Sequence, residues 1–259
     1  MPWALITGAS SGLGEEFAYA LARERFKLAL TARRKERLDA VAERARALGA
    51  LATEVIAQDL SRRDGPAALF EQLEQAGVTV DFLVNNAGFG TRGQFHKLPL
   101  ERELEQIDLN VGAVVAVARL AVAGMVERGY GTIINVASTS AFQPMPYMAV
   151  YGASKAFVLS FSLALAAEVG ARGVHVMALC PGVTRTEFQQ VAGTENVRIP
   201  AFGYMTAKTV VEQALAAVRR RKRVYVNGRM NRLMAAMVRF APRELVSRIV
   251  GAMFRPQES

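Results

Sequence analysis

A tyrosine and a lysine four positions apart, Tyr151 and Lys155, have the residue types and the spacing for proton-transfer chemistry. Residues four apart lie on the same face of a helix, so the two side chains would be neighbours. A free tyrosine has a pKa of about 10 and is a poor acid or base at neutral pH. A nearby ammonium stabilises the phenolate and lowers this pKa, so the pair predicts a residue that exchanges a proton with a substrate. Taken alone, the same spacing is also typical of an exposed Tyr–Lys pair on a helix surface.

A glycine-rich segment near the start of the chain has the features of a phosphate-binding loop. The apolar run 3–7 leads directly into Gly8, Gly12 and Gly14, and a helix-period segment follows. Glycines allow a tight turn and a close backbone approach, and the free N–H groups of a helix start favour negative charge. The segment therefore predicts a site for the pyrophosphate of a nucleotide. The alternative is a loop that only caps the helix.

Apolar runs of strand length alternate with helix-period segments along most of the chain. This alternation predicts one α/β domain of the Rossmann type, with a doubly wound parallel sheet of seven strands covered on both faces. We expect a catalytic domain over residues 1–228, with a lid over about 186–206, and an amphipathic helical extension over 229–259. The expected strands are 3–7, 27–31, 53–57, 80–85, 131–136, 174–179 and 223–226. The expected helices are 14–25, 35–48, 66–75, 101–127, 149–170 and 207–219.

Ligands of such a sheet bind beyond the carboxyl ends of the strands, and the polar motifs of this chain stand at those ends. Their order and spacing resemble the short-chain dehydrogenase/reductase superfamily over about residues 3–226, and the stretch 180–188 looks most like a bacterial branch of it. The matching motifs are the G-x-x-x-G-x-G spacing from Gly8 to Gly14, Asp59, Asn85-Asn86-Ala87-Gly88, Asn110, Ser138, Tyr151 with Lys155, and Pro181-Gly182.

The resemblance implies an enzyme that interconverts a ketone or aldehyde and an alcohol by hydride transfer with a nicotinamide cofactor. It implies that Tyr151 is the general acid/base and that Ser138 holds the substrate oxygen. Lys155 would bind the nicotinamide ribose, and Asn110 would position a water. The implied cofactor contacts are Gly8, Ser10, Ser11, Gly12, Leu13 and Gly14 at the pyrophosphate, Asp59 and Leu60 at the adenine, Asn86, Ala87 and Gly88 at the ribose, and Tyr151, Lys155, Pro181, Gly182, Thr184 and Thr186 at the nicotinamide.

The residues after the second strand determine which of the two nicotinamide cofactors such a site prefers. An enzyme that uses NAD usually places an acid there, whereas this chain has Arg33, Arg34 and Lys35. A guanidinium pairs bidentately with a phosphate, so we expect NADP(H) in preference to NAD(H), with Arg33 at the 2′-phosphate. The alternative is a solvated helix start. Ser11 stands where many NADP-dependent relatives carry a basic residue.

Apolar and aromatic side chains near the same strand ends are the candidates for substrate selection. Their composition predicts an apolar carbonyl or alcohol substrate, although it would also suit the edge of a core. The carboxylates and histidines have no spacing that predicts a metal site. The candidate pocket residues are Phe89, Phe142, Met145, Tyr147 and Phe188.

The positive charge of the chain is concentrated near its end. The 259 residues include 32 basic and 23 acidic ones, a net charge of +9. Residues 219–259 hold eleven basic and two acidic residues, a surplus of nine, so the preceding part is neutral. No nucleic-acid partner is therefore expected for the main body. The amphipathic segment 229–259 either packs on the body or another subunit, or lies on an anionic membrane surface.

The remaining composition indicates a folded cytoplasmic protein. At 51% hydrophobic and 21% charged residues, the chain is globular and not disordered. The single cysteine, Cys180, favours a reducing compartment. We expect a homodimer or homotetramer that pairs through the long helices 101–127 and 149–170. The competing function is a non-catalytic, cofactor-sensing protein of the same fold whose basic tail contacts a membrane or nucleic acid; such a protein has no need of the complete catalytic set.

Overall fold

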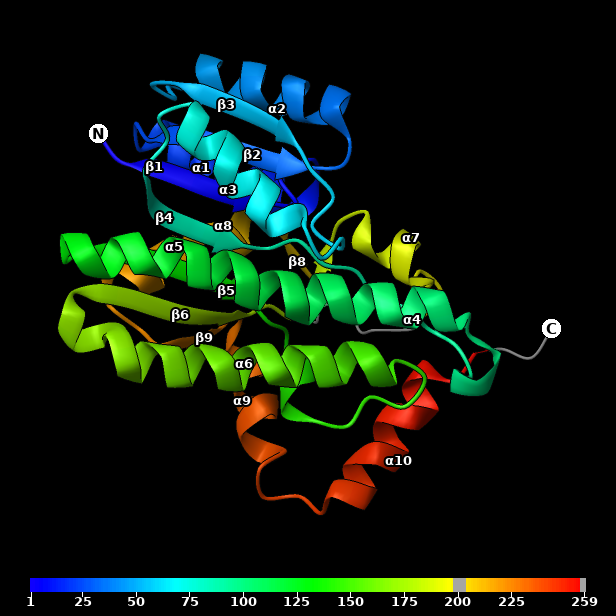
Figure 1. Cartoon of the computed structure of the whole chain (residues 1–259). Helices are drawn as coiled ribbons and strands as arrows, with labels where there is room; N and C mark the ends of the chain where they lie inside the picture. Colours follow the sequence, from blue (N-terminus) through cyan, green and yellow to red (C-terminus); the bar gives the residue numbers. More distant parts are fainter. Residues whose placement is uncertain (198–203, 257–259) are drawn as a thin grey trace.

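The seven main strands form one parallel sheet, whose strands follow one another from top to bottom in Figure 1 behind α3, α5 and α6. This computed structural model describes residues 1–197 and 204–256. The strand order is β3-β2-β1-β4-β5-β6-β9, so the direction of winding reverses between β1 and β4. The predicted seven-stranded, doubly wound fold is confirmed. The strands are β1 (Trp3–Thr7), β2 (Lys27–Ala32), β3 (Thr53–Ala57), β4 (Val80–Asn85), β5 (Gly131–Val136), β6 (Val174–Cys180) and β9 (Val224–Val226).

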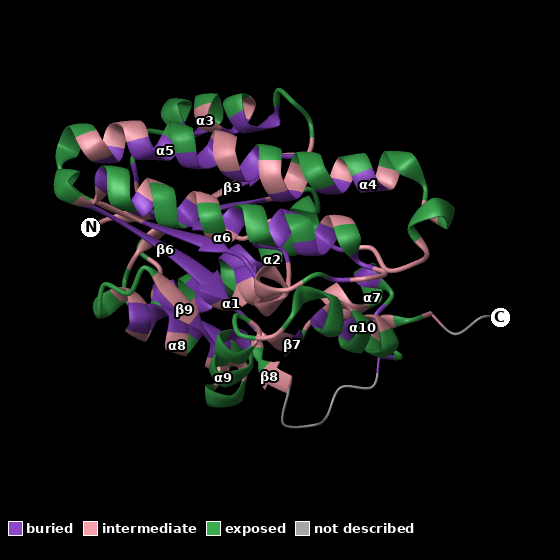
Figure 2. Cartoon of the chain, turned by 90° about the horizontal axis from the view of Figure 1, so that it is seen from below, coloured by how far each residue is buried: buried purple, intermediate pink, exposed green. Residues whose placement is uncertain are grey.

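Helices cover both faces of the sheet because alternate residues of each strand point to opposite faces. In β1, Ala4 and Ile6 belong to a buried cluster with the helices of one face, whereas Leu5 belongs to the cluster of the other face. Figure 2 shows the resulting buried layer between helices that are exposed on their outer sides. One face carries α1 (Gly12–Arg23), α2 (Lys35–Ala47) and α8 (Ala207–Arg219), and the other carries α3 (Gly65–Gln75), α5 (Val114–Arg128) and α6 (Ala149–Val169).

The helix predicted over 101–127 is divided by a wider turn. The π-helical segment η2 (Asp108–Ala113) lies between α4 (Leu100–Ile107) and α5. Such π-turns are common at functional sites, and this one contains Asn110. By length and composition alone, the stretches Leu100–Arg128 and Ala149–Arg172 would be apolar enough to cross a membrane. In the fold, however, α5 and α6 pack on the sheet, so the hydropathy of these segments is that of core helices.

Beyond the main sheet, the chain forms a small second sheet and three short helices. The strands β7 (Val183–Arg185) and β8 (Tyr204–Thr206) pair in parallel, a pairing that the sequence did not predict. Between them lies α7 (Phe188–Ala192), within the predicted lid; residues 198–203 of that lid lie outside the described part. The extension contains α9 (Arg229–Met237) and α10 (Arg243–Phe254), which are joined by a loop and both lie below the sheet in Figure 1.

Candidate active site

A cavity of about 430 Å³ lies at the carboxyl ends of the strands, where the sheet changes its winding direction. It extends from the glycine-rich loop after β1 to the first turns of α6 and to the end of α10. Both groups of residues selected from the sequence, the glycine loop and the Tyr–Lys pair, therefore meet in one cavity. Its lining includes Gly8, Ser10, Ser11, Gly12, Leu13, Arg33, Asp59, Leu60, Asn86, Ala87, Gly88, Ser138, Tyr151, Lys155, Pro181, Gly182, Thr184 and Thr186.

The glycine loop has a backbone shape that side chains would not allow. Gly8 and Gly12 have φ values of +65° and +61°, in the left-handed region that favours glycine. A Cβ atom on Gly14 would collide with the Gly8 carbonyl oxygen and would lie 2.7 Å from Asn86 Nδ2. The first turn of α1 can therefore approach β1 closely only with glycine at this position. The result is a concave backbone surface at a helix N-terminus, which is the shape that a pyrophosphate requires.

Asn86 and Thr7 fix this loop against the end of β4. Asn86 Nδ2 donates hydrogen bonds to the carbonyl oxygens of Thr7 (2.9 Å) and Gly8 (3.3 Å). The buried Thr7 hydroxyl accepts hydrogen bonds from the backbone N–H groups of Asn86 and Ala87, both at 2.9 Å. These bonds join the two strands at which the winding reverses. Asn86 thus supports the glycine loop as well as lining the cavity.

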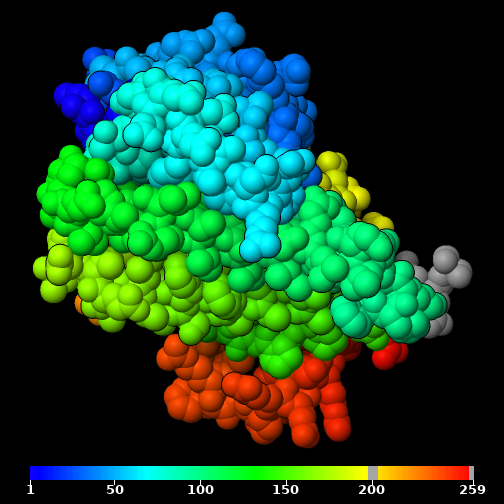
Figure 3. Space-filling model, in the orientation of Figure 1, coloured from blue at the N-terminus to red at the C-terminus, as the bar shows by residue number. Residues whose placement is uncertain are grey.

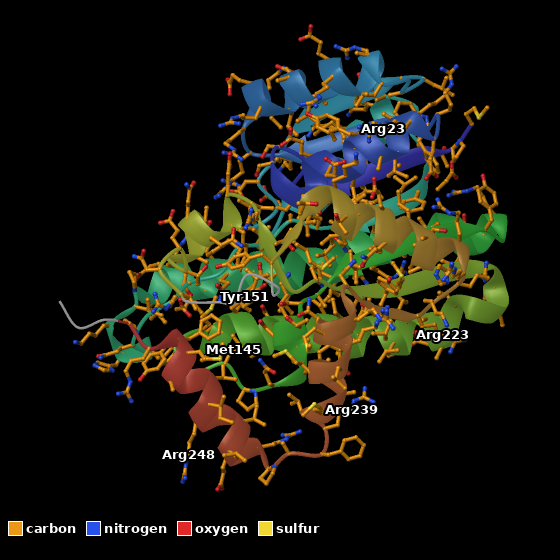
Figure 4. The ribbon with its side chains drawn as sticks, turned by 180° about the vertical axis from the view of Figure 1, so that it is seen from behind. Arg23, Met145, Tyr151, Arg223, Arg239 and Arg248 are labelled. Carbon is orange, nitrogen blue, oxygen red and sulfur yellow. The ribbon has the colours of Figure 1, made fainter. Side chains whose placement is uncertain are left out.

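The predicted catalytic side chains converge from β5 and α6. Ser138 follows β5, while Tyr151 and Lys155 occupy the first two turns of α6, and all three are buried. The Lys155 ammonium lies 5.8 Å from the centre of the Tyr151 ring and donates a hydrogen bond to the Val136 carbonyl at 2.9 Å. Figure 4 shows Tyr151 in the interior of the molecule beside Met145. The backbone of β5 therefore anchors the lysine next to the tyrosine.

The pKa of Tyr151 differs from the sequence prediction. Burial raises the pKa of Tyr151 to about 12, and the Ser138 side chain opposes this shift only in part. Burial also lowers the pKa of Lys155 to about 8. The sequence predicted a lowered pKa for Tyr151; burial instead raises it, because the phenolate loses its solvation while the Lys155 ammonium is directed at the Val136 carbonyl. At neutral pH the phenol keeps its proton and can donate it.

Asn110 ties the π-turn to the loop that follows β4. Its Oδ1 accepts a hydrogen bond from the Phe89 N–H (3.1 Å), and its Nδ2 donates to the Phe89 carbonyl (2.8 Å) and to Ser154 Oγ (3.1 Å). A Cβ atom on Gly88 would lie 2.8 Å from Asn110 Oδ1 and 3.5 Å from Lys155 Nζ. Asn110, Gly88 and Lys155 are therefore in close contact, and the amide orients the loop beside the lysine.

Two arginines after β2 line the end of the cavity away from Tyr151. Arg33, which the sequence selected, places Nη1 3.1 Å from Glu105 Oε1 and is 55% exposed. Arg34, which was not selected, donates from Nη2 to Ser10 Oγ (3.2 Å) and Ser11 Oγ (3.1 Å) of the glycine loop. The same guanidinium lies 3.0 Å from Glu187 Oε2. Positive charge is thus held directly against the glycine loop.

The apolar end of the cavity involves three of the five pocket residues expected from the sequence. Phe89, Met145 and Phe188 line it, and the Phe188 ring lies 5.3 Å from the Tyr151 ring, centre to centre. Phe142 lies outside the cavity, because it packs on the cluster that contains Ala235 of α9. Tyr147 is also outside: its backbone is left-handed and its hydroxyl accepts a hydrogen bond from Arg255 at 3.3 Å. Glu187, Thr194 and Tyr204 of the predicted lid also line the cavity, whereas Met148 and Phe254 are lining residues that the sequence did not indicate.

A cavity that joins a glycine-rich dinucleotide loop to a buried Ser–Tyr–Lys group defines an oxidoreductase of the nicotinamide-dependent type. A family model described as short chain dehydrogenase matches residues 2–196. The chain belongs to this family.

Curated relatives and solved structures are similar over nearly the whole chain. The Very-long-chain 3-oxoacyl-CoA reductase of Anas platyrhynchos is 32% identical over 222 residues, covering 83% of this chain and 68% of that protein. A short-chain dehydrogenase from Sphingobium yanoikuyae in complex with NADPH is 34% identical with a TM-score of 0.84, covering 100% and 97% of the two chains. The bulky-bulky ketone specific alcohol dehydrogenase from Comamonas testosteroni is 33% identical with a TM-score of 0.78, covering 93% of each chain.

Proposed function

We propose that this protein is an NADP(H)-dependent reductase that converts a ketone or aldehyde to an alcohol. The observation that carries the proposal is the arrangement of Ser138, Tyr151 and Lys155 in the same cavity as the glycine loop. The family of the chain supports hydride transfer as the reaction type. The residues at the cavity do not include a group that could itself supply a hydride, so a nicotinamide cofactor must do so.

The lining residues follow one another along the cavity in the order of the parts of such a cofactor. The Gly8–Gly14 loop would hold the pyrophosphate, Asp59 with Leu60 the adenine, and Asn86 with Gly88 the ribose. Lys155 would hold the nicotinamide ribose. Thr184 and Thr186 would contact the carboxamide, and both line the cavity. The bound nicotinamide would supply the hydride for the reduction.

Tyr151 supplies the proton in this proposal. Because burial raises the pKa of Tyr151 to about 12, the phenol is protonated throughout the physiological range. It therefore donates its proton to the carbonyl oxygen as negative charge develops there, while Ser138 holds that oxygen.

The preference for NADP(H) rests on Arg33 and Arg34. Both line the cavity after β2, where an enzyme that uses NAD usually carries an acid. Arg34 lies against the glycine loop, so either guanidinium is near the position of an adenosine 2′-phosphate. The NADPH complex of the Sphingobium yanoikuyae dehydrogenase supports the same choice.

The substrate in this proposal is a bulky or long-chain apolar carbonyl compound. Phe89, Met145, Met148, Phe188 and Phe254 form an apolar wall around the Tyr151 end of the cavity. The names of two relatives, which refer to a bulky-bulky ketone and to a very-long-chain 3-oxoacyl-CoA, agree with a pocket of this kind.

The test of the mechanism is Tyr151→Phe, assayed by NADPH consumption over a series of aryl, alkyl and long-chain ketones. We expect turnover to fall by about 10³-fold, because the general acid is removed, while NADPH binding by fluorescence titration stays unchanged. Tyr130→Phe, at an exposed tyrosine after α5, is the matched control and should be fully active. Turnover of Tyr151→Phe within a few-fold of the wild type would refute the assignment. A wild type that binds NADPH but reduces none of the ketones would instead support a cofactor-sensing protein.

We further propose that two copies pair through α4, α5 and α6. The support is a set of apolar side chains that these helices expose on their outer faces. Light scattering in solution measures the resulting mass. The exposed residues are Leu104, Ile107, Leu120, Phe157 and Leu163.

A further inference from the structure

The two helices of the extension form a hairpin that projects from the body of the protein. In Figure 3 the hairpin, coloured orange to red, stands out beneath the rest of the surface. Its inner side is held in place: Val246 and Val250 of α10 are buried in one cluster with Met145, Met148 and Tyr151. The hairpin is therefore packed against the body through the inner side of α10.

The outer side of the hairpin is apolar although it faces solvent. Phe240, in the turn between α9 and α10, is 90% exposed, and Met237 is 60% exposed. Large apolar side chains gathered in exposed positions of one short segment indicate an interaction surface in a folded protein. We call these residues, with the arginines among them, the hairpin surface. Its apolar members are Met230, Leu233, Met234, Met237, Phe240, Leu245, Ile249 and Met253, each at least 44% exposed.

Positive charge is interleaved with these apolar side chains. Between residues 229 and 256 the only acid is Glu244. Figure 4 shows Arg239 and Arg248 on the hairpin, at the end of the molecule away from Tyr151. Within the described part of the chain, no ion pair involves any arginine of this surface. The exposed arginines are Arg229, Arg232, Arg239, Arg243 and Arg248.

Charge complementarity decides what can cover this surface. A second copy in a twofold arrangement would bring the same surface against itself, so five arginines would face five arginines with one glutamate on each side to offset them. An anionic lipid surface presents the complementary charge and an apolar layer directly beneath it. The helices have 9 and 12 residues, too short to span a bilayer but suited to lie in its interface.

We propose that the hairpin surface docks the protein on an anionic phospholipid bilayer. Phe240 and the apolar residues of α9 and α10 enter the boundary between headgroups and acyl chains. Arg239, Arg243 and Arg248 pair with lipid phosphates around them. This contact leaves the inner side of α10 against the substrate end of the cavity, so docking and catalysis use different faces of the hairpin.

The test is co-sedimentation of the full chain with vesicles of phosphatidylcholine alone or with 30 mol% phosphatidylserine added, at about 0.1 M salt. We expect binding to the anionic vesicles only, and loss of binding at about 0.5 M salt because screening weakens the arginine contacts. Phe240→Ser should weaken binding about tenfold or more through lost apolar burial. Arg239→Gln and Arg248→Gln should each weaken it about fivefold.

Matched control variants test whether vesicle binding depends on this surface or on any exposed arginine or apolar side chain. Tyr130→Ser removes an exposed aromatic side chain after α5, and Arg220→Gln removes an exposed arginine from the basic run 219–223, which precedes β9. Neither should change vesicle binding by more than about twofold. Equal losses in control and hairpin variants, or no binding of the full chain to anionic vesicles, would overturn the proposal. So would a fall in solution mass by light scattering for Phe240→Ser, since the surface would then be covered by a second copy. NADPH binding and the unfolding midpoint of each variant show that it folds.

Discussion

Arg92 ties three distant segments together over the substrate end of the cavity. Its guanidinium donates hydrogen bonds to the carbonyl oxygens of Phe254 (2.9 Å), Arg255 (2.9 Å) and Gly193 (3.0 Å). Gly193 ends α7 and Phe254 ends α10, and Phe254 lines the cavity. Arg92 itself follows β4 and does not line the cavity. We therefore predict that it positions the pocket wall without touching the substrate.

The magnitude follows from the three bonds that Arg92→Gln would remove. A hydrogen bond from a charged donor contributes about 1.5–3 kcal/mol when buried, and Arg92 is only half-buried, so about 1 kcal/mol per bond is appropriate. Losing about 3 kcal/mol changes the equilibrium between the Phe254 wall in its observed position and a displaced wall by about 100-fold. The KM for a bulky ketone should therefore rise by one to two orders of magnitude. The kcat at saturation should change little, because Arg92 touches neither the substrate nor the reacting groups.

The assay measures KM for a bulky and a short-chain ketone, together with NADPH affinity. We expect the loss to be largest for the bulky ketone, because only that substrate reaches the wall formed by Phe254. NADPH affinity should stay within about twofold. Arg63→Gln, at an exposed arginine before α3, is the control and should behave as the wild type. A KM for the bulky ketone within twofold of the wild-type value in Arg92→Gln would show that packing alone holds the wall. Equal losses for both ketones would also contradict the positioning role.

Three further predictions concern the cofactor end and the acid/base pair. Burial lowers the pKa of Lys155 to about 8, so the side chain loses its positive charge as the pH rises through that value. The kcat/KM for NADPH should therefore fall about tenfold per pH unit above pH 8. A pH profile that stays flat to about pH 10 would contradict this. Arg34→Gln should raise the KM for NADPH about tenfold or more and leave the KM for NADH unchanged. Lys35→Gln, at a lysine that pairs with Asp39, is the control and should leave both KM values unchanged. Gly14→Ala should lower the free energy of unfolding by about 3 kcal/mol because the new Cβ meets the backbone of Gly8, a loss readable as a lower midpoint in calorimetry; an unchanged midpoint would contradict the close helix–strand approach.

The sheet could be predicted from the sequence because each strand carries its own signal. A strand covered on both faces is largely apolar, as in 3–7, and this pattern needs no information from elsewhere in the chain. The π-turn at Asn110 had no such signal, since its residues fit the helical period on both sides. The pairing of β7 with β8 was also beyond prediction, because two strands of three residues each carry too little pattern. Local periodicity gives the elements but not the interruptions and pairings that depend on distant contacts.

The same distinction applies to the site. The glycine loop and the Tyr–Lys pair are short motifs at strand ends, so their position in the cavity followed from the topology. Arg34 was passed over for Arg33 because the sequence does not show which of two adjacent arginines faces the glycine loop. The raised pKa of Tyr151 was missed because residue spacing indicates a neighbouring charge but not the burial that desolvates the phenolate.

Helix α10 shows why a single amphipathic pattern can hide two surfaces. Val246, Val250 and Phe254 form a stripe at four-residue spacing that faces the cavity and its supporting cluster. The stripe one residue earlier, at 245, 249 and 253, is exposed on the hairpin surface. Neighbouring residues in a helix are turned by about 100° from one another, so the two stripes lie on adjacent faces. Because the sequence is apolar at both sets of positions, its pattern predicts a single broad face that packs on the body. Only the fold distinguishes the stripe beside the substrate pocket from the stripe that we propose meets the membrane. Substitutions one residue apart should therefore affect different properties. Val250→Ser should change the KM for the ketone, whereas Ile249→Ser should weaken the binding to anionic vesicles.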